Sequence, residues 1–215
     1  MRFLAILLII GGLISGWFYL QKKRVENRAM AWAAQLVPHL SNSFVAGNAA
    51  ETAKKAEANV YWILFYFDKL VTEGMDPDKV LSDACAQINM PEAQSNVLHS
   101  SLMANYETAK KYQIFEDVTN VVKLEQGIPP LMKMSGWENE PVALSYIIPP
   151  SIAPEAAGAT ANLTLVPAIV NDAQSGRITP FMIEQARAME RAKIIVKTTL
   201  DELVAQAKKT ATEAR

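Results

Sequence analysis

Cysteine and histidine are scarce in this chain: Cys85 is the only cysteine, and His39 and His99 are the only histidines. A single cysteine excludes an internal disulfide and every Cys-x-x-Cys metal site. Neither histidine stands in a His-Glu-x-x-His, His-x-x-x-His or Glu-x-x-His spacing, so the common helix-borne zinc and di-metal motifs are absent. Chemistry based on these residue types is therefore limited to isolated side chains.

The sequence also lacks the glycine patterns of nucleotide sites and hydrolases. It contains no Gly-x-Gly-x-x-Gly, no Gly-x-x-x-x-Gly-Lys phosphate loop and no Gly-x-Ser-x-Gly elbow. Its 21 basic and 22 acidic residues nearly cancel, which leaves no charge excess of the kind that attracts nucleic acid. We therefore expect a protein that is not an enzyme, that holds no cofactor or metal, and that does not bind nucleic acid.

Charge is missing altogether from Phe3–Leu20, which Arg2 precedes and Lys22, Lys23 and Arg24 follow. Eighteen helical residues measure about 27 Å, close to the roughly 30 Å of a bilayer's hydrocarbon core. An isolated span in lipid must be helical, because only a helix satisfies all of its own backbone groups there. The pattern predicts a single transmembrane anchor at residues 1–21, with the lipid bilayer as the first partner.

A cleaved signal peptide is the alternative for this segment, and its orientation is a separate question. The run ends in Trp17 and Tyr19, which suit a membrane interface, and no small-residue cleavage site follows them. Basic residues prefer the cytoplasmic side, and more of them follow the run than precede it. We expect a single-pass membrane protein with a cytoplasmic body, although the excess is small and insertion the other way stays open.

Small residues in the anchor suggest a contact with another helix. Gly12 and Gly16 form a Gly-x-x-x-Gly, and Gly11 and Ser15 repeat the spacing one residue earlier. Small residues four apart make a flat face on which a second helix packs closely, although glycine is also simply common in membrane helices. We expect Gly12 and Gly16 to be helix–helix association sites.

Residues 22–126 predict a helical body. Apolar residues recur at helical spacing from Val25 to Pro38, so the anchor helix is expected to continue into the body. A second stripe runs from Ala49 to Val71, and Gly74 is expected to end that helix. Its run from Val60 to Phe67 suits a buried helix better than the alternative, a buried strand.

Further helix starts and stops follow in this body. Asp76-Pro77 is typical of a helix start, because Asp caps free N–H groups and Pro fits the first turn. We expect another helix after Pro91 and a short one over 114–124, ended by Gly127.

Residues 127–158 hold six of the chain's eleven prolines and predict a linker or extended arm. The arm is too apolar for a solvated tail, so we expect it to lie along the body or along a partner. Residues 142–148 are expected to form a short strand.

Residues 159–215 predict a second helical segment. Leu163 to Val170 is expected to be helical, and Thr179-Pro180 repeats the pattern of a cap followed by proline. A long helix to about Lys209 would carry an imperfect heptad seam, interrupted by Lys193. This helix is expected to pack on its own domain. The alternative is association with another chain, which would use Met182, Met189, Val196, Leu200 and Leu203.

A few isolated residues could in principle have a catalytic, ligand-binding or modification role. Cys85 and His99 would make a nucleophile and base if adjacent, but Cys85 is expected to be a small buried apolar residue. His39 is expected to be a polar cap or loop residue rather than a ligand of a haem or pigment metal. Glu138 and Glu140 are expected to be solvated rather than an acid–base or cation-binding pair. Asn162-Leu-Thr164 matches the glycosylation pattern and matters only in a secretory lumen.

These observations predict an all-α protein with one N-terminal transmembrane helix, a helical body, a proline-rich arm and a long C-terminal helix. Its expected role is a non-catalytic bitopic scaffold or accessory subunit of a membrane assembly, with a protein partner or a second copy of itself. The alternative is a membrane-tethered helical domain that binds a small apolar ligand such as a lipid, quinone or pigment, or an enzyme of unrecognised type. A cavity lined by Tyr61, Trp62 or Tyr66 would favour that alternative.

Overall fold

The computed structural model describes residues 2–44, 49–133, 136, 138–173 and 178–213, and for 2–18, 49–50, 171–173 and 209–213 it describes the backbone alone. The described chain is mostly helical, as predicted. Its elements are α1 (Arg2–Ser41), α2 (Ala49–Thr72), α3 (Pro77–Gln87), α4 (Glu92–Lys111), α5 (Val118–Glu125), β1 (Val142–Tyr146), β2 (Leu163–Pro167), α6 (Ala168–Ala173), α7 (Pro180–Arg191) and α8 (Lys197–Glu213).

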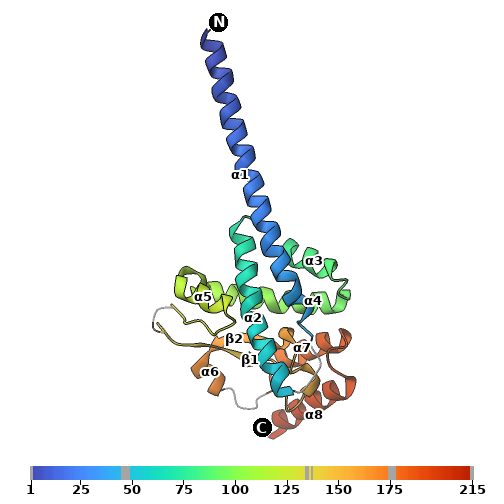
Figure 1. Ribbon diagram of the computed structural model, residues 1–215. Helices are drawn as coiled ribbons and strands as arrows, with labels where there is room; N and C mark the ends of the chain where they lie inside the picture. Colours follow the sequence, from blue (N-terminus) through green and yellow to red (C-terminus); the bar gives the residue numbers. More distant parts are fainter. Residues whose placement is uncertain (1, 45–48, 134–135, 137, 174–177, 214–215) are drawn as a thin grey trace.

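Helix α1 has 40 residues and runs without a break from the uncharged segment into the body, as predicted. At 1.5 Å per residue it is about 60 Å long. Figure 1 shows its N-terminal half standing clear of the other elements and its C-terminal half packed beside α2 and α3. Pro38 lies in the last turn, and the helix ends three residues later at Ser41.

Among the residues whose side chains are described, no helix combines the length and the apolar character needed to cross a membrane. Of the expected span Phe3–Leu20, only Tyr19 and Leu20 belong to those residues. The rest of that span, including Gly12 and Gly16, lies outside the described side chains.

Helix α2 is the centre of the core. Val60, Ile63, Leu64, Phe67 and Leu70 are all at most 1% exposed, which confirms the buried helix predicted for this run. The helix ends at Thr72, and Gly74 follows with φ +86°, a left-handed conformation that glycine adopts at little cost.

The predicted helix starts of the body are also confirmed. Asp76 caps α3, its side chain accepting a hydrogen bond from the Lys79 N–H at 2.9 Å. Helix α4 begins directly after Pro91. The predicted short helix is a 3₁₀ turn at Ile114–Glu116 followed by α5, and Gly127 closes it with φ +68°.

The proline-rich arm packs into the same core as the helices. Met132, Val142, Ile148 and Ala153 are at most 1% exposed and belong to one cluster of buried residues that extends from Ala29 to Leu203. The strand predicted at residues 142–148 is β1, which pairs antiparallel with β2 so that Leu144 lies opposite Leu165. The arm therefore lies along its own body, one of the two arrangements expected.

The helix predicted for Leu163 to Val170 is wrong, because Leu163–Pro167 is β2 and α6 begins only at Ala168. One edge of β2 pairs with β1. At the other edge, the Asn105 side chain of α4 accepts from the Leu165 N–H at 2.9 Å and donates to the Leu163 C=O at 2.9 Å. A partner 60 residues away in sequence thus supplies hydrogen bonds that a helix would have made internally.

The single long C-terminal helix is also wrong, because α7 ends at Arg191 and α8 starts at Lys197. Lys193 has φ +59°, and the Ile194 N–H bonds back to the Met189 C=O, as at the end of a helix. The carboxylate of Glu155 then accepts from the Val196 N–H at 3.2 Å and the Thr199 hydroxyl at 2.7 Å, which caps α8. A side chain of the arm therefore stabilises the break.

The break divides the predicted heptad seam. Met189 and Leu203 are fully buried in the chain's own core, Met182 and Leu200 are half-buried, and Val196 is 56% exposed. The two helices pack on their own domain, so this part of the chain presents no continuous seam to a partner.

Candidate functional site

The larger of two described hollows is a groove of about 570 Å³ between α1, the end of α2 and α3. Helix α1 contributes Glu26, Ala29, Met30, Ala33, Leu36 and Val37. The other wall and the floor come from Leu70, Met75, Val80, Asp83, Ala84 and Gln87. We call these twelve residues the α1–α3 groove.

The groove has an apolar floor and a mixed rim. Leu36 and Leu70 are at most 1% exposed, and both lie in the hydrophobic core. At the rim, Met30 is 63% and Met75 38% exposed, and the carboxylates of Glu26 and Asp83 face solvent. Flexible thioether side chains beside an apolar floor are typical of surfaces that adapt to a bound helix or lipid.

Local sequence features hold α3 beside α1. The turn at Gly74 and the Asp76 cap reverse the chain after α2, and Leu81 and Cys85 of α3 face the core. Arg28 and Glu73 join α1 to the end of α2 through two hydrogen bonds of 2.7 and 2.9 Å. The hydrogen bonds from Arg28 lower the pKa of the Glu73 carboxyl, which stays ionised and keeps the bridge intact.

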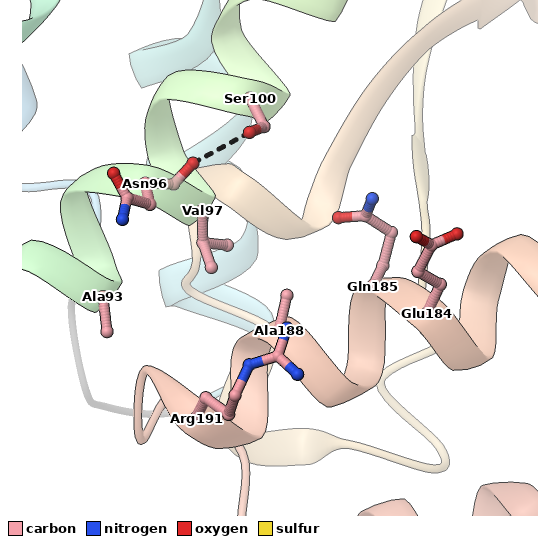
Figure 2. A pocket seen from close by; sticks show the side chains of 8 residues that line it. All are labelled: Ala93, Asn96, Val97, Ser100, Glu184, Gln185, Ala188 and Arg191. Carbon is pink, nitrogen blue, oxygen red and sulfur yellow. Dashed lines mark hydrogen bonds between the residues drawn. The ribbon is translucent and has the colours of Figure 1, made fainter.

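A second hollow of about 340 Å³ lies between α4 and α7 (Figure 2). Its lining is more polar, with Asn96 and Ser100 on one side and Glu184, Gln185 and Arg191 on the other. In Figure 2, Arg191 lies at one end and Glu184 at the other, so the two charges do not converge on one point. This arrangement is typical of a solvated seam between helices.

The Cys85 thiol lies in the core, as predicted, at 2% exposure. Burial raises its pKa, so it stays protonated and unreactive. His99 instead lies beside Asp78, with 3.1 Å between His99 Nε2 and Asp78 Oδ1. Neither residue has the surroundings of an activated nucleophile.

His39 lies in the last turn of α1 rather than in a loop, and aromatic rings enclose it. Its ring is 5.1 Å from that of Trp62 and stacks at 5.4 Å on that of Tyr66. Nδ1 lies 3.1 Å from the Asn59 side-chain oxygen, and burial lowers the histidine pKa. The neutral imidazole is part of the packing between α1 and α2.

The aromatic residues named for an apolar cavity are packed. Tyr61 is 3% exposed, and Trp62 donates its indole N–H to the Glu125 C=O at 3.1 Å. Neither described hollow is lined by Tyr61, Trp62 or Tyr66. The described hollow with an apolar floor lies instead along α1.

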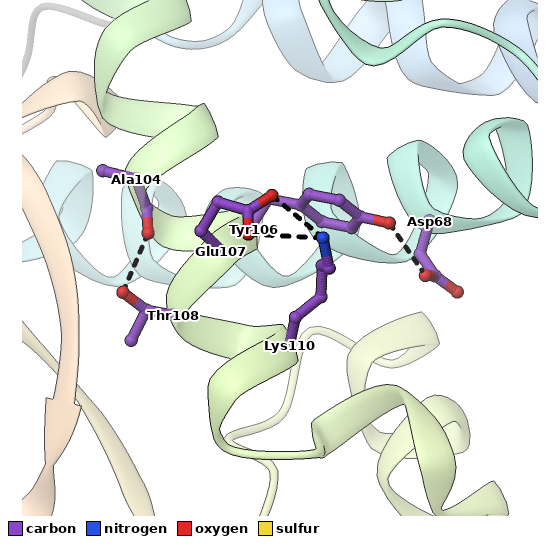
Figure 3. A network of polar contacts seen from close by, with 6 residues as sticks. All are labelled: Asp68, Ala104, Tyr106, Glu107, Thr108 and Lys110. Carbon is purple, nitrogen blue, oxygen red and sulfur yellow. Dashed lines mark hydrogen bonds and ion pairs between the residues drawn. The ribbon is translucent and has the colours of Figure 1, made fainter.

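A polar network joins α2 to α4 at the surface (Figure 3). Tyr106 donates to Asp68 Oδ1 at 3.4 Å, and Lys110 lies over the Tyr106 ring and pairs with Glu107 at 3.0 Å. Burial, with Asp68 beside it, raises the Tyr106 pKa to about 12, so the phenol stays protonated at neutral pH. The network links two helices and presents no nucleophile.

The other polar residues considered in the sequence analysis form hydrogen bonds with backbone groups. Glu138 accepts from the Gly136 N–H at 3.1 Å, and Glu140 accepts from the Ile169 N–H at 3.3 Å. Asn162 is fully buried and binds both backbone groups of Ile148, so in this fold it is inaccessible to glycosylation. Within the described residues, no three acidic, histidine or cysteine side chains form a metal-binding group.

The structure thus favours the α1–α3 groove as the candidate functional site. The apolar stripe predicted from Val25 to Pro38 contains the α1 wall of this groove, but local spacing does not indicate that α3 leaves part of the stripe open. No family model, no curated protein and no solved structure matches this chain.

Proposed function

We propose that this protein is a non-catalytic accessory or scaffold subunit, held in a membrane by residues 3–20 with its body on the cytoplasmic side. The observation that carries the proposal is helix α1. One unbroken helix joins an uncharged, 18-residue apolar run to the hydrophobic core of the body. Such a helix fixes the body beside a bilayer and offers one face of itself to a neighbour.

Two further features support this role. The basic residues Lys22, Lys23 and Arg24 follow the apolar run, where they would meet anionic lipid head groups. The α1–α3 groove begins at Glu26, only about 9 Å along the helix from Leu20, so a neighbouring subunit would reach it directly.

Membrane attachment is tested by alkaline extraction of membranes that contain the full chain. We expect the wild-type chain to stay in the pellet. Replacing Leu8 and Ile9 with Arg should release it, because each charge costs about 2.5–3.5 kcal/mol in a bilayer centre. Gln21→Arg, outside the run, is the matched control and should stay bound. Release of the wild-type chain would contradict the proposal.

Orientation is tested with a single engineered thiol. Val118 is 80% exposed, whereas Cys85 is buried, so Val118→Cys in a Cys85→Ser background gives one accessible site on the body. An impermeant maleimide added to intact cells should label this variant only after permeabilisation. Labelling of intact cells would place the body outside.

The groove itself favours a second candidate function, binding of a small apolar ligand such as a lipid, quinone or pigment. Its volume falls within the range of roughly 300–1,000 Å³ typical of ligand sites, and its floor is apolar. Native mass spectrometry of the purified full chain separates the two candidates. A retained small molecule that Ala33→Phe removes would favour ligand binding.

A further inference from the structure

We propose that the α1–α3 groove seats one helix of a different membrane protein, which lies along α1 and carries lysine or arginine opposite Glu26 and Asp83. This inference rests on the proposed function and adds to it the chemistry of the partner. Three observations support it: the groove runs parallel to α1, its α1 residues share one face of that helix, and its rim carries two carboxylates.

The groove follows the axis of α1 for three turns. Its α1 residues extend from Glu26 to Val37, which spans about 17 Å. An amphipathic helix in a groove makes its main contacts at positions i, i+3, i+4 and i+7, a span of two turns. The hollow is therefore long enough for the contact face of one helix, with Ala33 as the small residue at its centre.

The same face of α1 continues out of the body. Glu26, Met30, Ala33 and Val37 are spaced by four, three and four residues, and the series extends backwards through Lys23, Tyr19, Gly16 and Gly12. At 100° per residue all eight positions fall within an arc of about 100°. A partner helix seated in the groove would therefore remain on one face of α1 as far as the small residues of the apolar run.

The charges at the rim of the groove indicate which charges should border the apolar stripe of the partner helix. Asp83 takes part in no described ion pair, and Glu26 has only a 3.9 Å approach to Lys22, with both side chains largely exposed. These two exposed carboxylates beside an apolar floor complement a helix whose apolar stripe is flanked by basic residues. They would repel an acidic helix or an anionic head group.

A second copy of this chain fits the groove poorly. In a parallel two-fold pair the same patch faces itself, which would place Glu26 near its own copy and Lys23 near its own copy. Like charges facing each other destabilise such a pair. Basic residues opposite Glu26 are therefore not supplied by a parallel two-fold copy, which favours a different protein as the partner.

The test uses the full chain in phosphatidylcholine nanodiscs and two fluorescent 21-residue helical peptides. Both peptides carry the same Leu/Ala stripe, flanked by lysine in one and by glutamate in the other. We expect anisotropy to show at least fivefold tighter binding of the lysine peptide, since two rim charges change from attraction to repulsion. Empty nanodiscs correct for binding to lipid.

Variants locate the binding. Ala33→Phe fills the groove and should abolish binding of both peptides, whereas Ala31→Phe, at an exposed α1 position outside the groove, should not. Glu26→Lys with Asp83→Lys should reverse the preference. Circular dichroism melting of each variant confirms that it remains folded.

Equal binding of the two peptides would overturn the proposal, and so would binding that persists in Ala33→Phe. A phospholipid that co-purifies with the wild-type chain and with Ala31→Phe but not with Ala33→Phe would also overturn it. A disulfide-linked homodimer of Met30→Cys in the Cys85→Ser background would likewise replace it with self-association. Failure of the chain to enter nanodiscs would instead contradict the proposed function, and the peptide comparison can then be made without lipid.

Discussion

Helices α1–α4 and the segment from Gly127 to Pro167 share one hydrophobic core but are held in it differently. The helices satisfy their backbone groups internally and dock through apolar stripes such as that of α2. The proline-rich segment makes backbone hydrogen bonds of its own, including the β1–β2 ladder, but some of its buried backbone groups take side-chain partners instead.

Three buried asparagines supply such partners. Asn120 of α5 accepts from the Leu131 N–H and donates to the Leu131 C=O, and Asn162 does the same for Ile148. Asn105 of α4 binds β2 in a similar way. A side-chain amide offers a donor and an acceptor side by side, as a neighbouring strand would. The comparison shows that a chain can bury an extended segment by adding side-chain hydrogen bonds, two sets of them from helices, to the segment's own backbone bonds.

The largest effect is expected in the helical part. Phe67→Ala removes a fully buried ring from α2, and we expect it to lower the free energy of unfolding by about 3–5 kcal/mol. Phe181→Ala, at a 56% exposed position, is the control and should stay within about 0.5 kcal/mol. Urea denaturation measures both, and equal effects would mean that α2 is not the centre of the core.

Removing the side-chain amide of Asn162 should lower the free energy of unfolding through the extended segment. Asn162→Ala leaves the buried N–H and C=O of Ile148 without partners, so we expect a loss of about 2–4 kcal/mol. Asn96→Ala, at an exposed position in the second turn of α4, is the matched control. A loss below about 1 kcal/mol for Asn162→Ala would show that apolar packing alone holds the segment.

The junction of the two regions at Gly127 should be more sensitive than an ordinary turn. A Cβ there would lie 3.0 Å from Trp62 Cε2, in addition to the strain of φ +68°. Gly74→Ala carries the strain without the clash, because nothing lies within 4 Å of its Cβ position. We expect about 1 kcal/mol for Gly74→Ala and about 2 kcal/mol for Gly127→Ala. Thermal unfolding compares them, and equal losses would contradict the close approach.

The smallest effect on stability is expected from a change in pH, and it should come from a residue of the helical part, His39. Burial lowers the His39 pKa in the folded protein, so the unfolded chain binds this proton more readily. Stability should therefore fall as the pH drops through about 6.5, the ordinary histidine value. His39→Gln should flatten the dependence of Tm on pH between 7 and 5.5. An unchanged slope in His39→Gln would assign the effect to other groups.

The same contrast explains which features were predictable. The helices at Ala49–Thr72 and after Asp76 and Pro91 depend on stripes and caps within a few residues of each other, and the sequence was enough to place them. Strand β2 depends on Asn105, and the break after α7 on Glu155, each more than 40 residues away. The α1–α3 groove was missed for the same reason, because it depends on where α3 docks.

Helix α1 also has a mechanical consequence. Eight residues lie between Leu20 and Ala29, the first buried residue among the described side chains of α1, and they continue the helix without a linker. The body is therefore held about 14 Å from the end of the apolar run, at a set rotation about the helix axis. Such a connection behaves as a stiff lever: a tilt or twist of residues 3–20 would turn the body with it, and a load on the body would be felt along the same axis.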